Sequence, residues 1–236
     1  MTRAMRRLHK WLGLAIGLQW LLWAVSGLAM SLLDADKVRG RASRAAASAP
    51  KAWPADTTPV ARLSASSEPV LTVTTGWLLE RPVYRLASAS GTRLLDARTG
   101  EPVTVDAPLA RRLAQASYAG AGQAGPAEQV PRSLETRAHA GKVWRVAFSD
   151  EAATTVYLSL QGEVLEHRNR TWRVFDVFWM LHIMDYRERQ DFNHPLLAGM
   201  AIGALGLSLS GLWLLCTRSG RAGMVPGRRR PKRSRR

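Results

Sequence analysis

Two long uncharged stretches lie near the two ends of the chain. Residues 11–33 form a run of 23 uncharged residues, and residues 195–216 form a run of 22. At about 1.5 Å per residue the shorter run gives a helix of roughly 33 Å, enough to cross a bilayer core of about 30 Å. The first run is also longer than the apolar core of about 7–15 residues in a cleaved signal peptide. The pattern predicts two transmembrane helices.

A shorter apolar pattern precedes the second stretch. Its uncharged part is too short to span a bilayer, but aromatic residues and one histidine recur in it at helical spacing. We therefore expect an amphipathic helix over residues 171–186 that lies at the membrane surface and leads into the second span. The residues that define this pattern are Phe175, Phe178, Trp179, His182 and Tyr186.

The central region alternates between apolar and polar positions, and the alternation repeats. The segment VYRLA, which begins at Val83, returns as VWRVA from Val143, and each copy is followed by a Gly-Glu turn at Gly100 and Gly162. Each copy predicts antiparallel strands followed by a helix, and Asp106 is expected to cap the first of these helices. The fold class is therefore membrane α+β, with two transmembrane helices flanking two units that each combine an antiparallel sheet with a helix.

These patterns divide the chain into eight segments. Residues 34–69 are rich in Ala, Ser and Pro and predict a spacer that is disordered in part, and residues 119–131 predict a linker. The full division is 1–10 basic tail, 11–33 first span, 34–69 spacer, 70–118 first unit, 119–131 linker, 132–194 second unit, 195–216 second span and 217–236 polybasic tail.

Charge then fixes the expected orientation. The net charge is +16, yet residues 34–191 hold all 18 acidic residues together with 21 basic ones. Most of the positive charge therefore lies in the two short tails, and Lys and Arg beside a span stay on the cytoplasmic side. We therefore expect both termini on the cytoplasmic side and the centre of the chain on the outer side of the membrane. The polybasic end lacks stacking aromatics, which favours contact with the lipid bilayer over nucleic acid.

Small residues recur along one face of each span. Close approach of backbones at small residues is how membrane helices associate. The stripes allow two interpretations: helices packed on each other or on a second copy, or a flat cofactor lying against the glycines. The helix-packing candidates are Gly13, Gly17, Gly199 and Gly203.

Few other residues indicate chemistry. His139 and His167 read as surface histidines, and the single cysteine, Cys216, excludes an internal disulfide. The sequence shows no paired metal-ligand motif, nucleotide loop or nucleophile elbow. The carboxylates of Asp185, Glu188 and Asp191 alternate with arginines and predict surface ion pairs.

Several motifs together resemble a known family. LHKWLGLAIGLQWLLWAVSGL near the start, TTVYLSLQGEVLEHRNR in the second unit and MLH at residues 180–182 resemble the PepSY-associated transmembrane family, whose members are often called iron-regulated membrane proteins. The resemblance implies an inner-membrane protein with a periplasmic PepSY region. Larger members resemble b-haem reductases of ferric siderophores, in which histidines at the ends of spans hold haem.

By this resemblance the candidate haem ligands are His9 and His182, and His194 is a further candidate beside the second span. Bis-histidine ligation needs two imidazoles at one depth. A two-span chain does not obviously supply both, whereas a homodimer does by pairing His9 or His182 with its copy. Each histidine also has a simpler interpretation: an interfacial residue for His9, a packed residue for His182 and a helix cap for His194.

Three hypotheses for function follow. The first is a non-enzymatic accessory or interaction subunit that presents a periplasmic domain in envelope or iron-related electron transfer. The second is a minimal haem b electron-transfer protein, similar to a ferric siderophore reductase, that acts as a homodimer or with a redox partner. The third is a module that binds a periplasmic peptidase.

Overall fold

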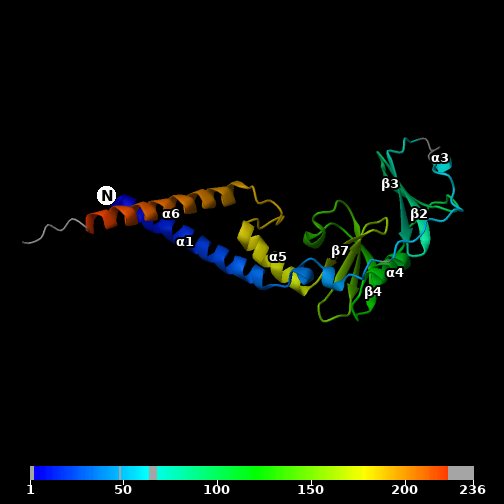
Figure 1. Cartoon of the computed structure of the whole chain (residues 1–236), viewed down its shortest axis with the longest axis horizontal. Helices are drawn as coiled ribbons and strands as arrows, with labels where there is room; N and C mark the ends of the chain where they lie inside the picture. Colours follow the sequence, from blue (N-terminus) through cyan, green and yellow to red (C-terminus); the bar gives the residue numbers. More distant parts are fainter. Residues whose placement is uncertain (1–2, 48, 64–67, 223–236) are drawn as a thin grey trace, which may run out of the picture. The chain divides into compact units, whose positions relative to one another are not determined.

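The computed structural model describes residues 3–47, 49–63 and 68–222, and for residues 3–6, 8, 9 and 210–222 it describes the backbone alone. The chain divides into two compact units. The helical unit consists of residues Met1–Leu28 and Met180–Arg236, and the sheet unit consists of Ala29–Trp179. Figure 1 shows the helices and strands of both units, coloured in their order along the chain.

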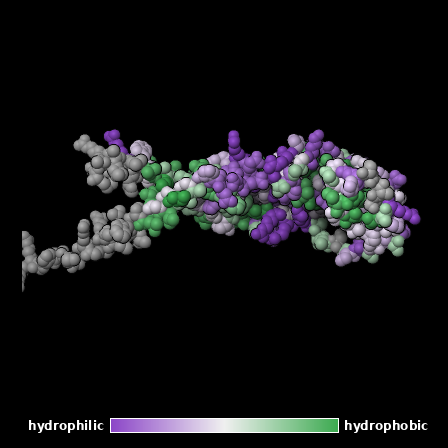
Figure 2. Space-filling model, turned by 90° about the horizontal axis from the view of Figure 1, so that it is seen from above, coloured by the Kyte–Doolittle hydropathy of each residue, from purple (hydrophilic) through white to green (hydrophobic). Residues whose placement is uncertain are grey.

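The helical unit is built on two long helices, α1 (Arg3–Leu32) and α6 (Pro195–Ala222). Within α1, Lys10–Leu32 is long and apolar enough to cross a membrane, and only 11% of its apolar window is buried. A core helix of a soluble protein is mostly buried, so this exposure favours a membrane-spanning role. Hydrophobic residues gather over the helices, shown in green in Figure 2.

The second predicted span is supported less completely. The described apolar part of α6, Pro195–Leu209, is shorter than a span. Residues 210–216 of the predicted span belong to α6, but their side chains lie outside the described ones. One helix, α1, therefore meets the length and composition of a span among the described residues.

The sheet unit contains two antiparallel sheets. The first has the order β1-β2-β3, with β1 at Thr72–Leu78, β2 at Arg81–Ser88 and β3 at Gly91–Asp96. The second has the order β4-β5-β6-β7, with β4 at Ala124–Val130, β5 at Val143–Phe148, β6 at Thr155–Leu158 and β7 at Val164–Arg168. Helix α4 (Ala107–Ser117) follows the first sheet and α5 (Arg170–Ile183) the second. The short helices are α2 (Ala35–Val38), η1 (Arg41–Ser43), α3 (Val60–Leu63) and η2 (Leu134–Thr136).

The predicted repeat is present in the structure. The two related segments form β2 and β5, and Gly100 and Gly162 at the two turns share a left-handed φ of 78°. Asp106 caps α4 by accepting a hydrogen bond from the Leu109 amide at 2.9 Å. Each copy also begins with an edge strand, β1 or β4, ahead of the repeated segment.

The predicted linker at residues 119–131 was wrong because it contains β4. Its Gly, Ala and Pro content hides any alternation, and Pro126 is tolerated because β4 is an edge strand that pairs only with β5. The ion pair of Glu128 with Arg145 at 2.8 Å adds a cross-strand contact. Tertiary pairing overrides local propensity in this segment.

The predicted spacer at residues 34–69 was also wrong for the residues of this range that the structure describes. Trp53 packs on Trp77 and Tyr84, with ring centroids 5.9 and 5.5 Å apart. The Thr58 amide donates to the Ala97 carbonyl at 2.7 Å. The composition of the segment did not reveal this packing, because a single tryptophan and a few aliphatic residues are enough for the segment to pack on the first sheet.

The two sheets share one hydrophobic core. Buried residues of β2, α4, β5 and β6 belong to a single cluster, so the predicted pair of units forms one compact body. The members from these four elements include Val83, Leu113, Val146, Val156 and Leu158.

Candidate functional site

His182, a candidate haem ligand, is held by two residues of α1. The hydroxyl of Ser26 donates to the Leu22 carbonyl at 2.6 Å, so its oxygen is able to accept a hydrogen bond from His182 Nδ1 at 3.0 Å. The Trp23 indole donates to the His182 carbonyl at 2.8 Å. A hydrogen bond at one ring nitrogen selects the tautomer, so that the other nitrogen keeps a lone pair with which it is able to bind a metal, as in metal-ligating histidines. Among the described residues, Nε2 has no hydrogen-bond partner.

His194 acts as a cap, one of the two interpretations that its sequence allowed. Its Nε2 donates to the Ile183 carbonyl at 2.9 Å, and its Nδ1 lies 3.4 Å from the Leu197 amide at the start of α6. Both ring nitrogens are therefore engaged. Ligation by His194 would require the loss of one of these contacts.

Two of these hydrogen bonds satisfy backbone carbonyls at the C-terminus of α5. The carbonyls of His182 and Ile183 lack intrahelical partners at a helix end, and they accept from Trp23 and His194 respectively. An unsatisfied carbonyl costs several kcal/mol in an apolar environment (about 2–7). The two side chains therefore let a helix end within apolar surroundings.

The other predicted site residues are placed less decisively. His9 lies in α1, but its side chain is outside the described ones. A methyl group on Gly203 would lie 3.1 Å from Ile16, whereas Gly13, Gly17 and Gly199 have nothing within 4 Å of such a group among the described residues.

A shallow groove lies over the glycines of α1. Its volume is about 290 Å³, just below the range of roughly 300–1,000 Å³ typical of ligand pockets. The groove is lined by Gly13, Ile16, Gly17 and Trp20 of α1 and by Ala204 and Ser208 of α6.

A haem group fits this chain only in part. His182 offers one oriented nitrogen, and six-coordinate haem b needs two axial ligands. Among the described residues no cluster of three His, Cys, Asp or Glu side chains forms a metal site.

The loop between α5 and α6 is organised by backbone hydrogen bonds to Asp185. The Asp185 carboxylate accepts hydrogen bonds from the amides of Arg187, Glu188, Gln190 and Asp191 at 3.0–3.1 Å. Burial raises its pKa, but these backbone bonds lower it by more, to about 2. The loop therefore keeps a fixed negative charge at neutral pH.

Asn169 joins the two ends of the sheet unit. Its side-chain amide donates to the Lys37 carbonyl of α2 at 2.7 Å, while its oxygen accepts from the Trp172 amide at the start of α5 at 2.8 Å. One side chain therefore bonds both to α2, where the chain enters the sheet unit, and to α5, where the chain leaves it.

His167 is a correction, because it was expected on the surface and is 1% exposed. Its Nδ1 lies 3.1 Å from the Ser43 hydroxyl and its Nε2 lies 3.2 Å from the Ser117 hydroxyl. The alternation of β7 was a usable signal, since His167 shares a strand face with Leu165 and not with Glu166 or Arg168.

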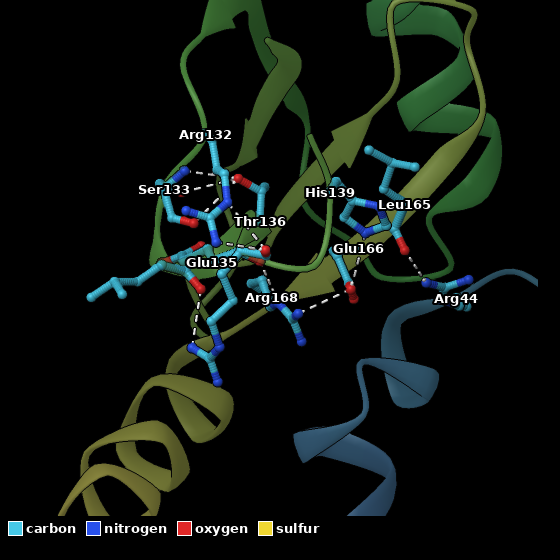
Figure 3. A network of polar contacts seen from close by, with 11 residues as sticks. Arg44, Arg132, Ser133, Glu135, Thr136, His139, Leu165, Glu166 and Arg168 are labelled. Carbon is cyan, nitrogen blue, oxygen red and sulfur yellow. Dashed lines mark hydrogen bonds and ion pairs between the residues drawn. The ribbon is translucent and has the colours of Figure 1, made fainter. Parts of the chain in front are cut away.

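A polar network fixes η2 to β7 and α5, and Figure 3 shows part of it. Glu166 accepts from Arg168 at 3.0 Å and lies 3.4 Å from His139. Arg168 also donates to the Glu135 carbonyl at 3.0 Å. Carboxylates here face positive side chains, which favours a structural role over catalysis.

The helices and sheets together define a class of protein. A long apolar helix together with an α+β unit of two antiparallel sheets indicates a membrane-associated protein. The chain belongs to the PepSY-associated TM region family, whose model matches residues 6–236. No curated protein and no solved structure matches the chain.

Proposed function

We propose that this protein is an accessory or interaction subunit of the bacterial inner membrane. Its α1 and α6 cross the membrane, both termini are cytoplasmic, and the sheet unit is presented on the periplasmic side to a partner in envelope or iron-related electron transfer.

One observation carries this proposal: the bond of Asn169 to Lys37 ties the incoming and outgoing segments of the sheet unit together. A domain whose two connections leave at one place is suited to presentation on a pair of neighbouring helices. Family membership and the basic tails of the sequence support the same arrangement.

Photo-crosslinking in cells tests the presentation of the sheet unit. A crosslinking residue at the exposed positions Thr74 of β1 or Gln129 of β4 is expected to capture a distinct membrane or periplasmic protein. A matched substitution at Leu18, an exposed residue of α1, controls for contacts made by any membrane protein. Adducts that are absent, or that contain only this chain, would contradict an accessory role.

Haem b electron transfer is a second candidate, favoured by the orientation of His182. Haem would supply one-electron redox chemistry when bound, while Ser26 holds the ring and Trp23 holds the backbone of the ligand. The peptidase-binding hypothesis has no comparable support from a described residue.

An absorbance spectrum of the detergent-purified protein tests the haem candidate. This candidate predicts a reduced b-type band that His182→Ala reduces by about tenfold or more, because the axial ligand is lost. His139→Ala, which changes a half-buried histidine of the sheet unit, should leave the band intact. A colourless protein from haem-replete cells would contradict this candidate.

A further inference from the structure

A buried histidine holds the segment that follows α1 and α2. This latch segment, residues 40–45, makes a short antiparallel contact with the end of α4: the Ala45 amide donates to the Ser117 carbonyl at 2.8 Å, and the Ala119 amide donates to the Ser43 carbonyl at 3.0 Å. His167 of β7 lies at the centre of this contact and bonds to Ser43 on one side and Ser117 on the other. Three separate parts of the chain therefore meet at one imidazole.

The two serines are able to serve either protonation state of the ring. The Ser43 hydroxyl lies 3.1 Å from the Gly40 carbonyl, and the Ser117 hydroxyl donates to the Ala114 carbonyl at 2.8 Å. Both oxygens are therefore able to accept from a doubly protonated ring. The cost of protonation is the burial of a charge and not the loss of hydrogen bonds.

The charges around the ring do not offset that cost. On the latch segment, Arg44 donates to the Leu165 carbonyl at 3.1 Å, and its positive charge opposes protonation. On β7, the nearest carboxylate in sequence is Glu166, which already faces Arg168 and His139.

The remaining charged groups on these elements have partners of their own. On the latch segment, Arg41 pairs with Asp36. At the end of α4, the Tyr118 hydroxyl donates to Asp150 at 2.8 Å, and burial followed by this bond raises the pKa of Tyr118. No carboxylate among the described residues is found in contact with the His167 ring.

We propose that His167 is an acid-sensitive latch, whose protonation releases residues 40–45 from α4 and β7 while both sheets stay folded. The hydrophobic core that joins the sheets contains neither His167 nor the latch segment. Release therefore frees residues 40–45, while the bond of Asn169 to Lys37 and the core of the sheet unit stay in place. This inference does not depend on the partner or cofactor proposed above.

The pH range follows from the two states of the ring. Burial, and in second place the charge of Arg44, lowers the pKa of His167 from 6.5 to about 4. The released ring returns to its ordinary pKa and binds protons more readily, so the latch is fully stable above about pH 6.5 and weakens as the pH falls towards 4. At pH 5 the open fraction is expected to rise about 30-fold relative to pH 7.5.

Hydrogen exchange of the full-length protein in detergent tests the latch. After correction for intrinsic rates, the amides of residues 43–45 and 119 should lose about 30-fold protection between pH 7.5 and pH 5, while β5 and β6 keep theirs. His167→Gln keeps a neutral donor and acceptor and should abolish the pH dependence, whereas His139→Gln should preserve it. Unchanged protection in the original protein, or an unchanged pH response in His167→Gln, would overturn the proposal.

A second variant keeps the test decisive if His167→Gln fails to fold. Arg44→Gln removes the opposing charge but retains a donor for the Leu165 carbonyl. The pKa of the latched ring should rise, so the loss of protection at pH 5 should be smaller than about 30-fold. An equal or larger loss in Arg44→Gln would contradict the electrostatic origin of the latch.

Discussion

Replacement of Arg137 with alanine is expected to lower the free energy of unfolding of the sheet unit by about 3–5 kcal/mol. Arg137 forms an ion pair of 2.7 Å with Asp176 of α5, and the two side chains are 15% and 4% exposed. Removal of the guanidinium takes away the cation that lies 2.7 Å from this buried carboxylate, which costs more than the pair contributes. Arg137 also lies over the Trp172 ring, 5.5 Å from its centroid.

Arg145→Ala is the matched control. Arg145 pairs with Glu128 at 2.8 Å, but these side chains are 47% and 52% exposed, so the expected loss is about 0–1 kcal/mol. Chemical denaturation of the full-length protein in detergent measures the free energy of unfolding of both variants. The protection of the β5 and β6 amides from exchange reports the unfolding. Equal losses for the two arginines would show that burial of Asp176 does not carry the effect.

Gly40→Ala is the second substitution with a large expected effect. Gly40 has a left-handed φ of 69°, and an added methyl group would lie 2.2 Å from the His167 carbonyl oxygen. The backbone of β7 cannot yield to this overlap as a flexible side chain would. The variant should lose about 3 kcal/mol or more, from left-handed strain of about 1–2 kcal/mol together with the displaced latch segment.

Gly141→Ala separates the two contributions. Gly141 shares the left-handed conformation, with a φ of 80°, but has nothing within 4 Å of an added methyl group among the described residues. Its expected loss is the backbone strain alone, about 1–2 kcal/mol. The same denaturation experiment compares the two, and similar losses would mean that the contact with His167 is not tight.

The sequence predicted those parts of the fold that local patterns specify. The repeated segments at Val83 and Val143 became paired strands, and Asp106 became the cap of α4. The start of α6 at Pro195 and the cap at His194 also followed from local chemistry. Each of these features depends on residues that are close in the sequence.

The missed features depend on contacts between distant residues. β4 has little strand propensity of its own and exists because β5 offers an edge. The packing of Trp53 needs the ring of Tyr84, 31 positions further along the chain. The burial of His167 needs Ser43 and Ser117, which the sequence does not mark as neighbours. The same limit applies to His182, whose orientation depends on Ser26 in α1.

Cysteine labelling most directly tests the central claim, that two helices hold the sheet unit outside the cell membrane with both termini inside. In a Cys216→Ser background, Ala89→Cys lies in the exposed turn between β2 and β3, and Ser234→Cys lies in the polybasic tail. A membrane-impermeant maleimide applied to cells with a permeabilised outer membrane should label Ala89→Cys at once and Ser234→Cys only after lysis. Labelling of Ser234→Cys in intact cells, or protection of Ala89→Cys until lysis, would contradict the account.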